Sequence, residues 1–220
     1  MTTYEDGVLH LDTDVLGARD LPRRLREEVR VIDAPHLLRI EGSAREGGGL
    51  EGCPNLVQLD APHMTVVEYA GLRDCGELLR LHVPSLVEMG PAACWGCHSL
   101  RSLDAPNLQE LPDLALTDAW HLCLLYAPNV SYVGPWALSG CESLRQLSLP
   151  YARVLDVGAL AGCSRLDSLR LPRLERACER SLDGVPAGAL MGLPADAQVS
   201  YGAYGEDPDS QNDELTFTIG

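Results

Sequence analysis

The sequence predicts an α/β solenoid: a right-handed superhelix of 22-residue turns, with one short parallel strand per turn on the concave face and short helical or irregular return segments. Two observations support this prediction. Aromatic residues make up only 5% of the chain, so the core must be filled by aliphatic side chains that each turn supplies at the same positions. In addition, prolines recur every 22 residues, at Pro62, Pro84, Pro106, Pro128, Pro150 and Pro172.

Three apolar columns precede these prolines at fixed offsets. The first two columns are leucine and run through Leu56, Leu78, Leu100, Leu122, Leu144 and Leu166, and through Leu59, Leu81, Leu103, Leu125, Leu147 and Leu169. A third column holds Ala61, Val83, Ala105, Ala127, Leu149 and Leu171. The last two columns alternate with polar positions, which predicts a short strand whose intervening residues face outward. Proline cannot donate to a ladder, so it ends each strand.

A further column lies nine residues before each proline: Cys53, Cys75, Cys97, Ala119, Cys141, Cys163 and Val185. We expect these cysteines to be buried, reduced thiols that pack as small apolar side chains. The column accounts for the Cys94–Cys97 C-x-x-C spacing without redox or zinc chemistry. The residue before each anchor is Gly or Asp, which tolerates a left-handed backbone at Gly52, Asp74, Gly96, Asp118, Gly140, Gly162 and Gly184.

The resulting consensus is C-x-x-L-x-x-L-x-[AVL]-P-x-L, followed by a segment that ends in A-L-x-G, as in WALSGCESLRQLSLP (136–150). It resembles the BspA-type (Treponema-type) leucine-rich repeats, whose turns carry A-F-x-x-C-x-x-L-x-x-I-x-[IL]-P. The resemblance covers residues 26–194 and implies an architecture, not an activity. One departure is that the family's Phe is replaced here by Leu72, Leu116, Leu138, Leu160, Leu182 and Cys94.

Three regions are expected along the chain. Residues 1–25 form an N-terminal cap with a short helix, for which Asp20 is the expected N-cap and Pro22 lies in the first turn. Residues 26–194 form about eight turns, one of which carries five extra residues near 46–49. Residues 195–220 form a C-terminal cap and acidic tail, in which 205–214 are polar and 215–219 have strand character suited to covering the last open edge.

The outward strand positions and the residues after the prolines supply the candidate partner-binding surface on the concave face. Its N-terminal half is acidic with interleaved histidines, its middle is aromatic, and its C-terminal half is basic. The candidate residues are Asp33, Asp60, Arg80, His82, Asp104, Leu124, Tyr126, Tyr151, Arg170 and Arg173. The alternative is that these positions are merely solvated. Side chains on successive rungs form a line and do not converge as metal ligands must, so we predict no catalytic residue, metal or cofactor.

Charge and composition narrow the function. The formal charge is −15, which opposes binding to nucleic acids and anionic membranes and either favours a basic partner or serves solubility. The start of the chain lacks the features of a signal peptide and no apolar run could cross a bilayer, so we expect a cytoplasmic protein, with delivery by a specialised secretion system left open. All 17 basic residues are Arg. The absence of Lys fits either codon bias or selection against side-chain amines to which a ubiquitin-like protein could be attached.

The favoured function is therefore a non-enzymatic module that binds a protein or an extended peptide. Two alternatives remain from the sequence. One is an effector or immunity protein that binds a host or competitor protein. The other is a metal-dependent enzyme that uses the Asp/His ladder.

Overall fold

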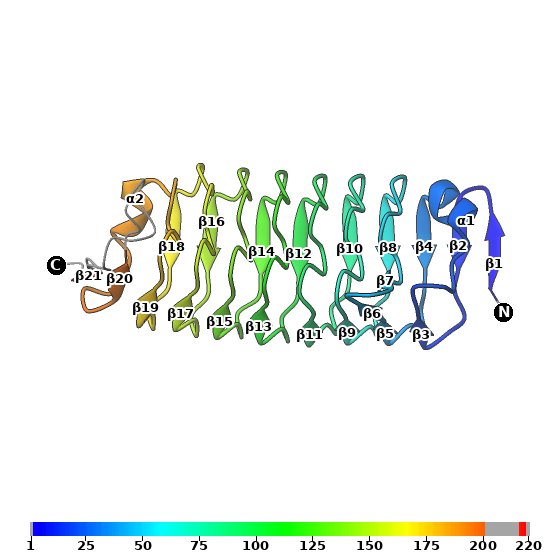
Figure 1. Ribbon diagram of the computed structural model, residues 1–220, viewed down its shortest axis with the longest axis horizontal. Coiled ribbons are helices and arrows are strands. Elements are labelled where there is room, and N and C mark those ends of the chain that lie inside the picture. Colours follow the sequence, from blue (N-terminus) through cyan, green and yellow to red (C-terminus); the bar gives the residue numbers. More distant parts are fainter. Residues whose placement is uncertain (1, 201–215, 219–220) are drawn as a thin grey trace.

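The computed structural model describes residues 2–200 and 216–218. Within them the chain forms a β-solenoid of about nine turns with repeats of about 22 residues, which confirms the predicted solenoid. The turns stack along the long axis of the molecule (Figure 1). Each turn contributes one three-residue strand to a first, parallel ladder, composed of β2 (Val8–His10), β4 (Val31–Asp33), β8 (Gln58–Asp60), β10 (Arg80–His82), β12 (Ser102–Asp104), β14 (Leu124–Tyr126), β16 (Gln146–Ser148) and β18 (Ser168–Arg170).

Each turn also contributes a second strand, which follows the proline in every turn but the first and which the sequence did not predict. These strands are two residues long except for the last, and they form a second parallel ladder, whose strand pairing is interrupted between β11 and β13: β3 (Val15–Leu16), β5 (Arg39–Ile40), β9 (Val66–Val67), β11 (Glu88–Met89), β13 (Glu110–Leu111), β15 (Tyr132–Val133), β17 (Val154–Leu155), β19 (Arg176–Ala177) and β20 (Gln198–Ser200). A return segment of turns then leads back to the first ladder.

Six return segments close with two left-handed residues, four positions apart, whereas the turn that carries the insertion has only the one before the anchor, Gly52. The predicted position before the anchor is confirmed, with positive φ from Gly52 to Gly184 in every turn. The second position was not predicted, because five of its six occupants are not glycine: Ala70, Ala92, Leu114, Trp136, Gly158 and Arg180. The turns are held by backbone bonds to the next rung, such as Leu72 N–H to the carbonyl of Ala93 at 2.8 Å. These bonds between rungs offset the cost of the strained conformation.

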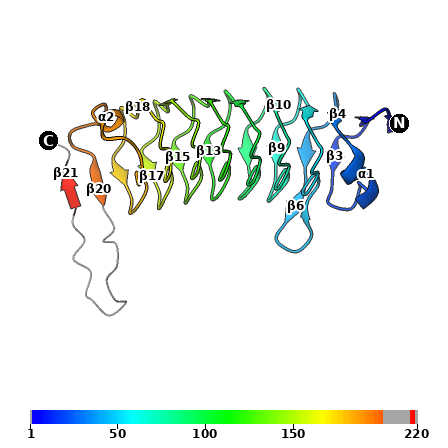
Figure 2. The same cartoon turned by 90° about the horizontal axis from the view of Figure 1, so that it is seen from above.

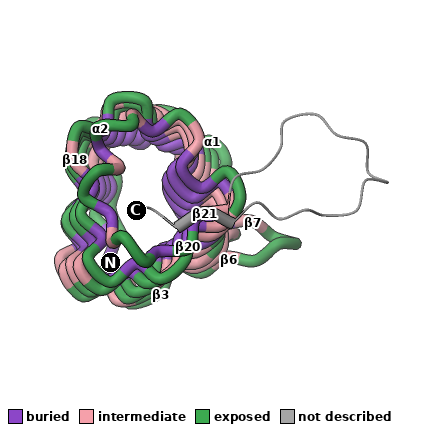
Figure 3. The backbone as a smooth tube through the Cα atoms, turned by 90° about the vertical axis from the view of Figure 1, so that its left-hand side faces the viewer, coloured by how far each residue is buried: buried purple, intermediate pink, exposed green. Residues whose placement is uncertain are grey.

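The core is one continuous cluster along the whole solenoid. It holds the predicted leucine, alanine and anchor columns together with the inward residue of each second-ladder strand, such as Leu111 and Leu155, both fully buried. Figure 3, viewed along the solenoid, shows the turns stacked in register around this common interior. No turn can bury its apolar face alone, so the stability of each turn depends on its neighbours.

The N-terminal end differs from the expectation in two respects. The parallel ladder begins at β2, not after residue 26, and β1 (Thr3–Glu5) pairs with β2 as an antiparallel edge. This rung escaped prediction because it lacks the anchor Cys and the proline. Asp20 is not the N-cap: helix α1 (Arg23–Glu28) begins after Pro22, and the Asp20 carboxylate instead accepts a hydrogen bond from Gly17 N–H at 2.6 Å.

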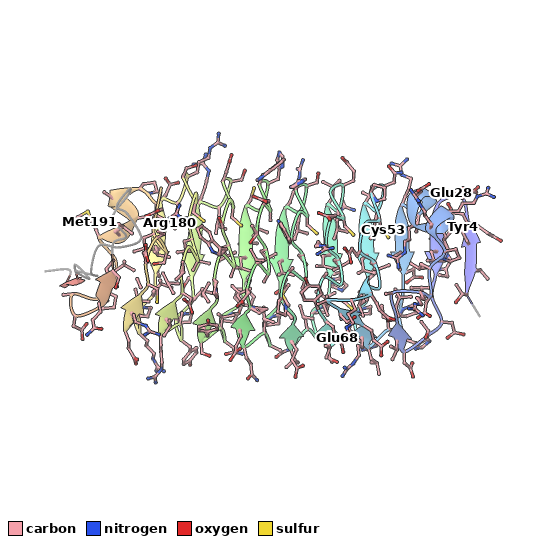
Figure 4. All side chains as sticks on the ribbon, in the orientation of Figure 1. Tyr4, Glu28, Cys53, Glu68, Arg180 and Met191 are labelled. Carbon is pink, nitrogen blue, oxygen red and sulfur yellow. The ribbon has the colours of Figure 1, made fainter. Side chains whose placement is uncertain are left out.

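The five extra residues form a hairpin that projects from the solenoid (Figure 2). Its strands, β6 (Gly42–Ser43) and β7 (Gly47–Gly48), pair antiparallel. At its base, Glu68 (labelled in Figure 4) accepts hydrogen bonds from Gly42 N–H at 3.1 Å and from Arg39 at 2.6 Å. Glu51 accepts from Gly48 N–H at 2.9 Å and pairs with Arg73. The insertion is therefore tied to its own turn and to the turn that follows it.

At the C-terminal end, α2 (Ala187–Leu190) packs near β18, and β21 (Thr216–Thr218) pairs antiparallel with β20. The predicted acidic tail at 205–214 lies outside the described residues. Neither α1 nor α2, the helices of the described part, has the length and apolar character required to cross a membrane.

Candidate partner-binding face

The first ladder presents a surface that we call the strand face. It consists of the outward residues of β8, β10, β12, β14, β16 and β18. In each strand the middle leucine is buried and the two flanking residues face outward. The register stacks equivalent residues of successive turns, so that Asp60 lies beside His82 and Asp104 beside Tyr126. The predicted outward positions therefore lie on one surface, with a rigid sheet behind them.

The charges are distributed unevenly along the first ladder. At its N-terminal end, His10 Nδ1 lies 2.9 Å from the Asp33 carboxylate, and His82 Nε2 lies 4.0 Å from that of Asp60. Further along, Asp104 and Arg170 are both exposed, and neither side chain has a hydrogen bond or ion pair within the described part of the chain. These two groups are available to charges outside the molecule.

Four exposed apolar side chains lie in two successive turns at the middle of the solenoid, and we call them the central patch: Leu124, Tyr126, Tyr151 and Trp120, which are 58, 52, 45 and 43% exposed. Three of them belong to a single turn, 120–126. The two strand columns that hold Leu124 and Tyr126 carry no other exposed Leu, Tyr or Trp among the described residues. The central patch is thus a local departure from the repeat.

Trp120 was not among the predicted site residues. Its ring stacks on His98 with the ring centroids 3.9 Å apart, and His98 Nδ1 is in turn held 2.9 Å from the carbonyl of Asp118. A shallow depression of about 460 Å³ adjoins it, lined also by His121, Glu142, Ser143 and Arg165. The signal for Trp120 in the sequence was weak, because its column has no consensus and reads Pro54, Gly76, His98, Glu142 and Ser164 in the other turns.

Side chains after the prolines have mixed roles. The Arg173 guanidinium lies over the Tyr151 ring at 4.7 Å from its centroid, which holds the ring at the edge of the strand face. Asn107 and Asn129, by contrast, donate to the proline carbonyls of the preceding turns at 3.3 and 2.8 Å, and Ser85 donates likewise at 2.8 Å. These three residues stabilise the stacking of turns, so we do not assign them to binding.

The anchor cysteines have a structural role that their hydrogen bonds explain. Each of four thiols donates to the carbonyl 25 residues earlier, at 3.2–3.5 Å: Cys75, Cys97, Cys141 and Cys163. Burial raises the pKa of Cys163 to about 12 and that of Cys141 well above its usual value. The hydrogen bond to Cys94 and burial raise the pKa of Cys97 in the same direction. These thiols remain protonated at neutral pH and are poor nucleophiles.

Thiol reactivity tests this account. In the native protein at pH 7.5, we expect Cys123 to react first with a thiol reagent because it is exposed, whereas the half-buried Cys178, whose pKa is raised by burial, should react more slowly. The six buried thiols should react only after unfolding. Counting modified residues by mass spectrometry over time measures this, with Cys123→Ser as the control that should lose the fast phase. Rapid modification of a buried cysteine in the native protein would contradict the assignment.

No group of three or more His, Cys, Asp or Glu that could hold a metal ion occurs among the described residues. In the acidic end of the first ladder, the nearest such side chains occupy consecutive rungs and form a line. The outward side chains at this end therefore form an open row along the ladder.

Comparison with known proteins supports this description of the fold. The chain matches no protein-family model and no curated protein. Among solved structures it is similar to a leucine-rich-repeat protein of T. pallidum, with 19% sequence identity, 88% of this chain and 87% of that chain covered, and a TM-score of 0.57. The fold is that of a leucine-rich-repeat protein.

Two further leucine-rich-repeat structures match with TM-scores below 0.5. One is from Bacteroides ovatus, at 14% identity, 90% and 75% coverage of the two chains, and a TM-score of 0.35. The other is a cell surface protein from Faecalibacterium prausnitzii, at 10% identity, 93% and 96% coverage, and a TM-score of 0.45.

Proposed function

We propose that this leucine-rich-repeat chain is a non-enzymatic binding module whose strand face and central patch dock a protein or an extended peptide. The observation that carries the proposal is the central patch. Leu124 and Tyr126 are more than half exposed, although a rigid strand holds them on a surface where the repeat otherwise places polar residues. Clustered exposed apolar side chains on a soluble fold are typical of interaction sites, and tyrosine is enriched there.

The charges differ between the two sides of the central patch. Asp60 and Asp104 lie on one side of the patch along the ladder, and Arg170 and Arg173 lie on the other. A partner that presents an apolar side chain between oppositely charged ends matches this order. Charges outside the buried centre contribute more to orientation and association rate than to affinity.

A comparison of affinity purifications from the source cell tests the proposal. The double variant Leu124→Ser/Tyr126→Ser is expected to lose at least about tenfold of a bound protein relative to the wild type, because truncating central apolar contacts costs about 2 kcal/mol or more. The matched control is Tyr4→Ser/Leu38→Ser, which removes an exposed Tyr and an exposed Leu away from the strand face. If both variants retain the same proteins as the wild type, the strand face is not the binding surface.

A further inference from the structure

The strand face carries no net formal charge, in contrast to the chain as a whole. Its six strands hold two aspartates, Asp60 and Asp104, and two arginines, Arg80 and Arg170, whereas the full chain has a formal charge of −15. A surface selected for a basic partner should be acidic throughout. This face instead has an aspartate in its first strand and an arginine in its last. A second copy in the opposite orientation therefore brings its arginine opposite the aspartate of the first.

We propose that a second copy of this chain docks on the strand face, antiparallel to the first, about a two-fold axis that runs between β12 and β14. The inference rests on the proposed function, since it names the partner of the same face. A two-fold interface uses one patch on both subunits, so that patch must be self-complementary.

The register of the ladder fixes which residues face each other. With the axis parallel to the strands, β12 lies opposite β14 of the second copy, β10 opposite β16, and β8 opposite β18. Asp60 then faces Arg170 of the second copy, and Asp104 faces Tyr126. Arg80 faces a glutamine and His82 faces a serine, so no like charges oppose each other.

Other positions of the axis are less favourable. An axis through β12 places Asp104 against its own equivalent, and an axis through β14 places His82 opposite Arg170. An axis between β10 and β12 pairs His82 with Asp104, but it places Arg170 opposite His10 and leaves Asp60 opposite the uncharged Tyr126. An axis between β14 and β16 pairs Asp104 with Arg170, but β8 and β10 then have no strand of the first ladder opposite them. Only the axis between β12 and β14 pairs Asp60 with Arg170.

The contacts within the molecule leave these groups available. The side chains of Asp104 and Arg170 have no ion pair or hydrogen bond within the described residues, and both are exposed, whereas the Asp60 carboxylate lies 4.0 Å from His82 Nε2 of the same chain. The same arrangement covers Leu124 and Tyr126 from both copies near the axis, which removes their apolar surface from water. Six rungs at about 4.8 Å span roughly 24 Å from the first to the last, which suits a small interface of the kind that weak complexes use.

Sedimentation equilibrium of the full chain at increasing concentration, with two complementary variants, tests the proposal. In a dimer of the Asp60→Arg variant, each introduced arginine faces Arg170 of the other copy. In a dimer of the Arg170→Glu variant, each introduced glutamate faces Asp60 of the other copy. Each variant alone should dissociate at least about tenfold more readily than the wild type. An equimolar mixture of the two should regain the wild-type dissociation constant within about threefold. In the mixed dimer the introduced arginine of one chain faces the introduced glutamate of the other, and the remaining native Asp60 faces the remaining native Arg170.

Glu110→Arg and Arg176→Glu serve as matched controls, since both residues are exposed on the second ladder. Neither control should change the dissociation constant. Circular dichroism of every variant verifies that the solenoid is folded.

Three outcomes would overturn the inference: a wild-type chain that stays monomeric up to several hundred micromolar, single variants that dimerise as the wild type does, or a mixture that fails to regain association. If the wild-type chain stays monomeric but the Leu124→Ser/Tyr126→Ser variant loses captured proteins, the second copy is refuted as the partner and the proposed function remains. If the wild-type chain stays monomeric and the Leu124→Ser/Tyr126→Ser variant retains all captured proteins, both proposals are refuted.

Discussion

Gly48→Ala is expected to lower the free energy of unfolding by about 3 kcal/mol, because the added methyl group has no space. A Cβ at this position would lie 2.1 Å from the carbonyl oxygen of Ala70 and 2.5 Å from the Cα of Gly71. Both are backbone atoms of the next turn, so the clash can be relieved only by separating β7 from that turn. The φ angle of Gly48 is not positive, so the effect is steric and not conformational. Chemical denaturation monitored by circular dichroism measures it.

Gly188→Ala is the matched control for this experiment. Gly188 lies in α2, and no atom lies within 4 Å of the Cβ that would be added. Alanine there should be neutral or raise stability by up to about 1 kcal/mol, since it reduces the freedom of the unfolded chain. If the two variants had the same stability, the close approach of the hairpin base to the next turn would be refuted.

Leu103→Ala is expected to destabilise the protein by about 2–5 kcal/mol. Leu103 is 1% exposed on β12, at the middle of the core, and its removal leaves a cavity between two rungs that the flanking turns cannot fill without losing their register. Because each turn contacts only its neighbours, amide hydrogen exchange should accelerate most in β10, β12 and β14. Ser102→Ala, on the same strand but exposed, should change stability by less than about 0.5 kcal/mol. A Leu103 variant with wild-type stability would show that the turns do not share one core.

The elements that the sequence predicted are those built on repeated columns. The inward position of Leu81, the buried anchor at Cys97 and the left-handed backbone at Gly140 each follow from a residue type that recurs at one offset, because the same local environment recurs in every turn. The second ladder could not be found in this way. Its strands have only one inward residue, and their outward positions vary without pattern, as in Glu88–Met89 and Arg176–Ala177.

Other features depend on contacts between rungs that no single turn contains. The left-handed conformation of Leu114 and Trp136 is imposed by bonds to the next turn, since their residue types disfavour it. Likewise, the alternation of the strand placed Asp104 and Tyr126 on the strand face, but it could not distinguish the structural Asn107 from an available side chain. That distinction rests on a hydrogen bond to Pro84, in the preceding turn.

The hairpin of residues 42–48 gives the molecule a practical point of attachment. The chain leaves the solenoid after β5 and rejoins it before Leu50, yet β5 and β9 pair in the same parallel register as later rungs. The spacing of the turns is thus independent of how many residues the tip contains. A fluorophore or peptide tag inserted beside Ala44, on the exposed tip, would report on the protein without touching either ladder, whereas the same insertion at Gly48 would push against the backbone of the next turn.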